Sequence, residues 1–417
     1  MTQIVPSPSR VTGVTGVPDL PGWDATWRLA RDGYAFGQRG FRDVGADAFR
    51  TRLLARPVVV ARGAEAAHVF GEPDAFERRG AIPRSVVHLL QDEGSVQQLE
   101  GPRHGERKVL MLELAQGERA GLVEAFRDAW PEVVAEHGHG AVPAAEVAAR
   151  ALTRAALEWT GIRVDRGRET ELSGELTEMI ARAGSVGPLN WKARLRRRRT
   201  EAWARDVVRE RRAAGDHETI AGRLAHHTEG GRPLDEDVAA VEMLNLLRPT
   251  VAVARFVAFA AHALHRHPDW ASQTRGGDAA ATRWTADEVR RFYPFFPMVG
   301  GIATEPFELH GEWFEEGQWM MLDLYGTDHS PELWERPDVF NPGRFATASP
   351  HAVVAQGVGE HLASHRCPGE LATVDLLVET LQQLTQGPAY TVPEQDLRIS
   401  LRRIPAEPED GMILQFA

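Results

Sequence analysis

Cysteine is nearly absent from this chain, which has a single one, Cys367, among 417 residues. One thiol excludes an internal disulfide and any metal site built from several cysteines. Three roles stay open for it: a buried inert thiol, a nucleophile, or the one thiolate ligand of a larger cofactor. A single cysteine without a secretion signal fits a reducing cytoplasm, where we expect the protein to be located.

Basic residues are fewer than acidic ones, and long apolar runs are scarce. The chain has 48 Lys and Arg against 59 Asp and Glu, a net charge of −11, and nucleic-acid-binding proteins usually carry a basic footprint instead. No apolar run approaches the ~20 residues of a membrane span. Residues 1–22 are rich in Pro, Gly, Ser and Thr. We expect them to form a mobile tail rather than a targeting peptide, followed by a single domain over residues 23–417.

Strand-like segments are few, and most of the chain has helical periodicity. Asp235 begins a stretch that we expect to form one long helix to about His267, because Pro268 ends it. The whole pattern predicts a mainly α protein with a small strand-containing lobe. Apolar residues recur three and four positions apart over 65–70, 105–115, 118–136, 144–161 and 169–184, and extended runs are limited to 57–61, 305–309 and 319–324.

One basic run, Lys192–Arg199, interrupts the otherwise acidic chain. The simpler interpretation is a solvated helix face. The alternative is a docking site for an acidic partner or an anionic surface, and the sequence leaves both open.

The residues around Cys367 favour a thiolate. His365 and Arg366 precede it, and Pro368-Gly369 predicts a turn whose N–H groups can point at the sulfur. A helix with an apolar stripe is predicted from Glu370 onward, and its N-terminus would place a positive dipole end near the thiol. These neighbours favour a cofactor ligand over an inert thiol.

Charged residues elsewhere recur at spacings that need a common explanation. Glu288 and Arg291 are three residues apart on a predicted helix and therefore share a face. Arg344, in the run Phe340-Asn-Pro-Gly-Arg-Phe, can complete a charge network with them. His104 and Lys108, four residues apart, form a second pair.

Glu-x-x-Arg, then Phe-x-Pro-x-Arg-Phe, then a cysteine loop running into a helix resembles the cytochrome P-450 superfamily. The resemblance implies the cytochrome P-450 fold, a helical domain with a small β-rich lobe, and a haem b whose iron takes the Cys367 thiolate as axial ligand, which favours O–O cleavage. It also implies that His104, Lys108, His365 and Arg78 contact the haem, whose two carboxylates need cationic partners when buried. It gives Glu288, Arg291 and Arg344 a structural role.

The departures from the family pattern are informative. The usual loop has Phe seven residues before the cysteine and Gly four before it, where this chain has Glu360 and Ala363. The usual long helix carries an acid and a threonine over the iron, where this chain has Arg248 and Pro249 before Thr250. Pro249 removes a backbone donor, so the helix should kink. Arg248 is a permanent cation in an apolar stretch and must find an anion.

Arg-Pro at this place resembles one branch of the superfamily, the bacterial fatty-acid peroxygenases. Further agreement includes Phe76-Glu-Arg78, Trp191-Lys192, residues 288–295 and residues 365–370. In that branch the arginine binds the substrate carboxylate beside the haem, and the bound acid serves as the acid–base group that splits hydrogen peroxide. The resemblance therefore implies that Arg248 and Pro249 are catalytic, that the substrate is a carboxylic acid hydroxylated at the α or β carbon, with decarboxylation as a further outcome, and that no redox partner is required.

The remaining pocket residues follow by counting along the same resemblance. Gln97 matches a distal-pocket position that is Gln or His in the branch, and Phe295 is a retained substrate contact. Gln91, or Leu90 if the count is off by one, and Ala183 stand where relatives have phenylalanine. These two replacements indicate a wider or more polar pocket, or a repacked one with an unchanged substrate.

Three functions remain open on the sequence. The first is a peroxide-driven fatty-acid hydroxylase, the second a monooxygenase that receives electrons from a ferredoxin docked near Arg194–Arg199, and the third a haem-binding sensor or carrier without turnover. Arg248-Pro249 favours the first over the second. An apolar pocket with a carboxylate-binding arginine argues against the third.

Overall fold

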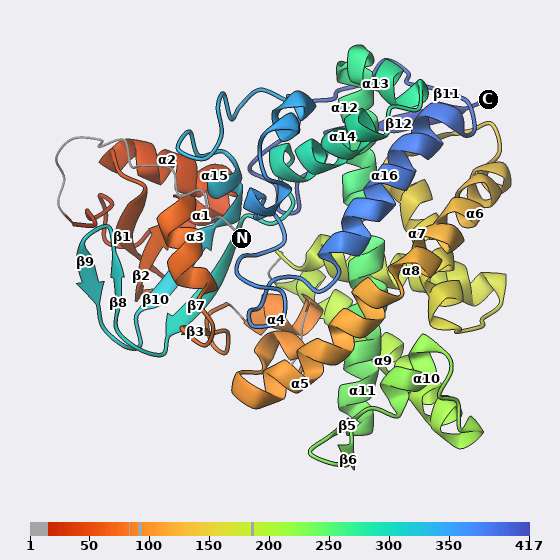
Figure 1. Ribbon diagram of the computed structural model, residues 1–417, viewed down its shortest axis with the longest axis horizontal. Helices are drawn as coiled ribbons and strands as arrows, with labels where there is room; N and C mark the ends of the chain where they lie inside the picture. The colour runs from red at the N-terminus through yellow and green to blue at the C-terminus, as the bar shows by residue number, and fades with distance from the viewer. Residues whose placement is uncertain (1–15, 83, 91–93, 185–186) are drawn as a thin grey trace.

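The computed structural model describes residues 16–82, 84–90, 94–184 and 187–417. They form a strand-containing lobe at one side and a larger helical lobe at the other (Figure 1). The helices are α1 (Thr26–Asp32), α2 (Ala35–Val44), α3 (Gly63–Gly71), α4 (Arg84–Leu90), α5 (Gly101–Leu112), α6 (Arg119–His137), α7 (Ala144–Thr160), α8 (Arg166–Arg182), α9 (Pro188–Ala214), α10 (Ile220–Ala225), α11 (Glu236–Ala252), α12 (Ala254–Arg266), α13 (Pro268–Arg275), α14 (Ala279–Phe292), α15 (Leu324–Asp328) and α16 (Glu370–Gln386). The strands are β1 (Ala48–Leu53), β2 (Arg56–Ala61), β3 (Phe76–Glu77), β4 (Ala141–Pro143), β5 (Thr228–Glu229), β6 (Arg232–Pro233), β7 (Met298–Ala303), β8 (Phe307–Leu309), β9 (Glu312–Phe314), β10 (Trp319–Asp323), β11 (Tyr390–Thr391) and β12 (Ile413–Phe416).

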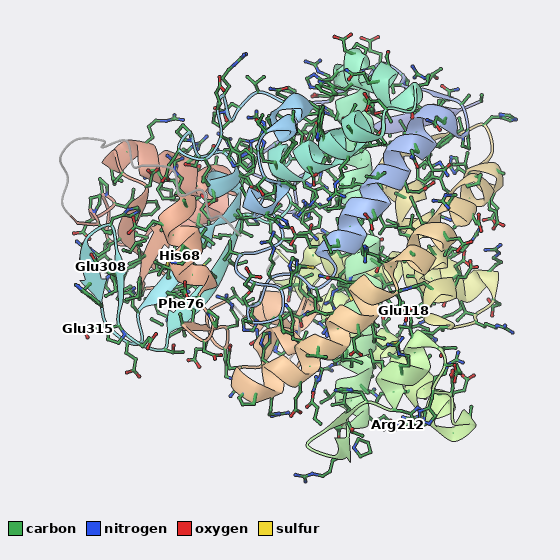
Figure 2. The ribbon with its side chains drawn as sticks, in the orientation of Figure 1. His68, Phe76, Glu118, Arg212, Glu308 and Glu315 are labelled. Carbon is green, nitrogen blue, oxygen red and sulfur yellow. The ribbon has the colours of Figure 1, made fainter. Side chains whose placement is uncertain are left out.

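The strand-containing lobe is built on a five-stranded sheet in the order β1-β2-β10-β7-β3. β10 runs parallel to β2 and antiparallel to β7. Its side chains alternate between two apolar clusters, Trp319 and Met321 on one face and Met320 and Leu322 on the other, as the two-residue period of a strand requires. Because both faces are covered, the strand is apolar up to its last residue, Asp323. In the cluster of Met320 and Leu322, Phe76 (labelled in Figure 2) stacks on Phe70, 5.0 Å between ring centroids.

The helical lobe holds the largest apolar core, which α6, α7, α11, α12 and α16 share. The C-terminal half of α9 is tied to this lobe by Arg212, whose guanidinium donates to the carbonyls of Ala225 (2.8 Å) and Leu234 (2.7 Å) (Figure 2). Among the described helices, the segment Glu236–Arg266 is long and apolar enough to span a membrane, but 83% of its most apolar window is buried inside the molecule. The segment is therefore a core element, and the prediction of a mainly α fold with a small β-rich lobe is confirmed.

The long helix expected from Asp235 to His267 is in fact two, which corrects that prediction. Pro249 lies inside α11, and the break falls one turn later at Val253, between α11 and α12. There the Val253 N–H donates to the Thr250 carbonyl (3.2 Å), three residues back, whereas an α-helix bonds four back. The regular hydrogen-bond ladder thus ends within a turn of Pro249, which itself lacks the donor for the Asn245 carbonyl.

The prediction of a mobile tail over residues 1–22 is wrong for residues 16–22. Residues 1–15 lie outside the described residues, but residues 16–22 are packed on the sheet. Val17 and Leu20 are buried, and the Leu20 N–H donates to the Arg50 carbonyl in β1 (2.8 Å). Two apolar side chains among the prolines and glycines are enough to hold this segment, and the composition of the segment concealed them.

Candidate active site

Cys367 lies in a tight loop directly before α16. Its N–H donates to the Gln356 carbonyl (3.0 Å), and its own carbonyl accepts from the Glu370 N–H (3.3 Å). Gly357 closes the loop with φ +104°, and a Cβ there would come within 3.3 Å of the Arg366 backbone, so glycine is the residue that fits. The loop thus fixes the sulfur at the N-terminal end of a helix, as the sequence predicts.

The sulfur is surrounded by few positive groups. Burial raises the pKa of the Cys367 thiol, while the Gly369 N–H and the Lys108 ammonium lower it without reversing the effect. The Gln356 amide nitrogen lies 3.9 Å from the sulfur. The protein alone therefore favours the thiol, and a bound metal ion would be needed to make the thiolate the stable form.

The hydrogen bonds of the two predicted flanking side chains go to carboxylates, which corrects the sequence interpretation in part, although Arg366 still interacts electrostatically with the sulfur. The Arg366 guanidinium binds the Glu370 carboxylate, at 2.5 Å and 2.9 Å. The His365 Nε2 lies 3.1 Å from a Glu100 carboxylate oxygen. Both side chains turn to carboxylates because a buried polar or charged group is costly without a partner. Lys108 of α5 is a further cation that interacts with the sulfur.

Four basic side chains predicted to contact a haem converge beside this loop. The His104 and His365 rings lie against each other with centroids 4.2 Å apart and planes tilted by 32°. The Lys108 ammonium donates to the Arg366 carbonyl, and the Arg78 guanidinium lies over the Phe70 ring, 4.2 Å from its centroid. Segments far apart in the chain thus bring the predicted residues together.

Burial disfavours the charge on all four side chains. It is the main cause that lowers the pKa of His104 to about 3, of Lys108 to about 8 and of Arg78 to about 10, and it also lowers the pKa of His365. Within the described residues Glu100 is the carboxylate of this cluster, and Lys108, only 2% exposed, has no ion pair. A ligand that carries two carboxylates would restore the lost solvation. The residues present therefore fit a haem whose iron is bound by Cys367 and whose propionates are held by these basic side chains.

Helix α5 connects the cysteine loop to α11. Lys108 reaches the loop, whereas the preceding residue, Arg107, donates to Glu242 on α11 (2.6 Å). Glu242 also accepts from the Asn245 amide (2.9 Å) and the Val96 N–H (2.7 Å). Burial raises the pKa of Glu242, although Arg107 and Asn245 lower it. Two neighbouring α5 residues thus bind the cysteine loop and α11.

The Asn245 side chain of α11 connects Arg248, on the same helix, to Gln97. The Arg248 Nη2 donates to the Asn245 Oδ1 (2.6 Å) and to the Leu90 carbonyl of α4, and the Asn245 Nδ2 donates to the Gln97 Oε1 (3.2 Å). The Thr250 hydroxyl donates to the Leu246 carbonyl (2.8 Å), so its hydrogen bond lies within its own helix. The site thus carries a guanidinium and two amides where the usual pattern has an acid and a threonine.

The other predicted pocket residues are less well defined. Phe295 stacks on Phe256 with centroids 4.1 Å apart, and its carbonyl accepts from the Tyr34 hydroxyl (2.8 Å). Ala183 is buried in the main core at the end of α8. Gln91 lies outside the described residues. Substrate contact by these residues stays a prediction.

The predicted charge network is present between α14 and the segment that contains Arg344. Glu288 accepts two hydrogen bonds from Arg291, both 2.8 Å, and one from Arg344 (3.1 Å). It also accepts the Asn341 N–H (2.8 Å), which fixes the following loop. Glu288 and Arg291 are 0% exposed, so these charges lie in the interior. The neighbouring Arg290 donates to Glu370 and to Gln356, the residue beside the sulfur.

The sequence interpretation missed the residues that hold the others in place. These are Asn245 and Glu242 on α11, Gln356 beside the sulfur, and Glu370, whose carboxylate also binds Arg290 (2.5 Å). An acid four residues after Arg366 was the available signal for Glu370. For Glu242 and Asn245, a buried polar residue every third position in an apolar helix was the signal.

Comparison with known proteins agrees with this geometry. A family model for cytochrome P450 matches residues 280–378. Cytochrome P450SP alpha (CYP152B1), solved in complex with (R)-ibuprofen, is 35% identical, with a TM-score of 0.90 over 94% of this chain and 98% of that one. Cytochrome P450EX alpha (CYP152N1) with myristic acid is 34% identical, with a TM-score of 0.90 over 96% of this chain and 98% of that one.

A more distant curated relative is cytochrome P450 137 of Mycobacterium tuberculosis, 26% identical over 208 residues. That alignment covers 48% of this chain and 43% of the relative, so the chain spans less than half the length of this curated relative. The solved structures, in contrast, match over nearly their whole length at more than 30% identity. The chain therefore belongs to the cytochrome P450 family.

Proposed function

We propose that the protein is a haem-thiolate peroxygenase that uses hydrogen peroxide to hydroxylate a fatty acid or a related carboxylic acid at the α or β carbon, with decarboxylation as a second outcome. The observation that carries the proposal is the position of Arg248. It lies on α11 beside Asn245, which bonds Gln97, and α5 connects α11 to the Cys367 loop. Two structural relatives were solved with carboxylic acids, myristic acid and (R)-ibuprofen.

The side chains can bind the acid and position a proton without a redox partner. Arg248 presents a planar fork that can hold a carboxylate by two hydrogen bonds and stays charged. Asn245 orients both Arg248 and Gln97, so the anion would be fixed between a guanidinium and an amide. The bound carboxylate can then accept a proton from peroxide and return it. It would replace the acid that the usual pattern places in this part of α11.

The cofactor is proposed to be haem b with Cys367 as its axial ligand, and it would supply the iron chemistry that transfers oxygen to a C–H bond. Lys108, Arg78, His104 and His365 would hold its carboxylates. We propose that the enzyme acts in the cytoplasm and forms one domain after the N-terminal residues.

The proposed function is tested with the free acid and its methyl ester. Esterification removes the negative charge that Arg248 is proposed to hold and leaves the alkyl chain unchanged. With hydrogen peroxide alone, we expect fast turnover of a fatty acid and slow turnover of its methyl ester, measured by product formation. Equal rates for the two would rule out the carboxylate mechanism and favour a ferredoxin-dependent monooxygenase.

The cofactor assignment predicts a spectroscopic change in Cys367→Ala. The reduced carbon monoxide adduct of the unmodified protein should show the red-shifted Soret band of thiolate ligation, because Cys367 is the only thiol of the chain. The variant should lose that band and bind less haem. A variant with full haem content and the same band would refute the assignment.

A further inference from the structure

The outer face of the N-terminal half of α9 carries large apolar side chains in solvent. Trp191 is 67% exposed, Leu195 58% and Leu189 53%. Burying such side chains would normally stabilise the fold, and a monomeric protein rarely leaves them grouped. We define the α9 patch as these three residues together with Lys192, Arg198 and Arg199.

The helical period brings most of the patch to one face. Trp191, Leu195 and Arg198 follow the i, i+4, i+7 spacing of one face. Lys192 and Arg199 each follow a residue of that face by one position and lie at its edge. Ala193, Thr200 and Ala204 are buried on the opposite face, where α9 packs against α4, α8 and α11 (Figure 1). The segment is therefore an amphipathic helix with its inner face in the core and a second, apolar–cationic face outside.

The charges of the run divide into two groups. Arg196 binds Glu178, and Arg197 is buried with Glu201 as a partner at 2.6 Å. In the described part of the chain, Lys192, Arg194, Arg198 and Arg199 enter no ion pair. This local excess of positive charge stands out in a chain of net charge −11, whose overall charge would keep it away from an anionic surface.

We propose that the α9 patch docks on an anionic lipid surface. A tryptophan and leucines surrounded by lysine and arginine are the composition of helices that lie in the interface of a membrane, with the apolar side chains among the acyl chains and the cations at the headgroups. An acidic protein would engage the cations but would leave the centre of the patch, Trp191 and Leu195, without a matching apolar surface.

The patch also lies on the side of the molecule that holds Arg248. On the inner face of α9, Arg197 donates to the His88 carbonyl of α4 (2.8 Å), and two residues later the Leu90 carbonyl of α4 accepts from Arg248. A lipid surface on α9 would thus be separated from the proposed carboxylate site by α4. The docking proposal does not depend on the proposed function, since it concerns binding of the surface alone.

The test is sedimentation of the haem-loaded protein with vesicles. Phosphatidylcholine vesicles are compared with phosphatidylcholine–phosphatidylglycerol vesicles at low and high salt. We expect binding to the anionic vesicles only, weakened by salt. Arg198→Glu with Arg199→Glu should lower the partition coefficient by at least about tenfold, and Trp191→Ser with Leu195→Ser should lower it as well.

Matched controls separate the patch from general charge and exposure. Arg42→Glu with Arg402→Glu changes the net charge equally at exposed positions elsewhere, and Trp313→Ser removes a tryptophan of similar exposure, 68%. These variants should bind like the unmodified protein. The proposal fails if the unmodified protein does not bind anionic vesicles, if the patch variants bind as well as the controls, or if an acidic ferredoxin binds the patch and vesicles do not. Its outcome is independent of the ester test.

Discussion

Arg248→Ala is expected to lose turnover of fatty acids by more than its loss of binding. Removing a charged hydrogen bond to the substrate carboxylate costs about 1.5–3 kcal/mol, which corresponds to roughly ten- to hundredfold weaker binding. The misplaced carboxylate can then no longer exchange a proton with peroxide, so kcat should also fall at saturating substrate. Binding is measured by spectral titration with the acid, and kcat by product formation with peroxide.

A small acid provides the control for this interpretation. Acetate in excess can occupy the carboxylate site of the unmodified enzyme and should support the peroxide-driven oxidation of a substrate without a carboxyl group. In Arg248→Ala the same acetate should have little effect, since its anchor is gone. An Arg248→Ala enzyme that keeps its kcat on fatty acids would show that the arginine only contributes affinity.

Glu288→Ala is expected to give misfolded or haem-poor protein. Glu288 is fully buried between Arg291 and Arg344, and removing one member of a buried ion pair costs about 3–5 kcal/mol because the remaining charges stay in the interior. The variant also loses the acceptor of the Asn341 N–H and so loosens the following loop. Denaturant unfolding and the haem content of the purified protein measure the effect.

The matched control is Glu171→Ala, which removes a surface pair with Arg168, with Glu171 68% exposed. Exposed pairs contribute about 0–1 kcal/mol, so this variant should unfold close to the unmodified protein. If Glu288→Ala were fully loaded with haem and as stable as Glu171→Ala, the cluster would not have the structural role we assign to it.

Local spacing made part of this molecule predictable. Glu288 and Arg291 are three residues apart on one helix, so their contact follows from helix geometry. Cys367 and its turn are adjacent in the chain, so their position before α16 follows as well. Both predictions depend on residues near one another in sequence, for which the backbone leaves few alternatives.

Competition between distant partners made the rest unpredictable. His365 lies two residues before the cysteine, but its ring turns to Glu100, more than 200 residues away. That partner depends on packing that no local pattern describes, whereas the Arg366 partner, Glu370, lies four residues on and could have been read from helix spacing. The helix break falls at Val253, one turn after Pro249, so the position of the proline alone did not give it.

The order in which the ribosome makes the chain sets when this protein can receive its cofactor. The contact between Lys108 and the Arg366 carbonyl joins residues 258 positions apart, and the contact of Glu100 with His365 joins residues 265 apart. At about 5–20 residues per second, the α5 side of the pocket waits roughly tens of seconds for the cysteine side. During synthesis the chain therefore carries only one side of the cofactor site. The cofactor can be bound only after the cysteine loop has been synthesised.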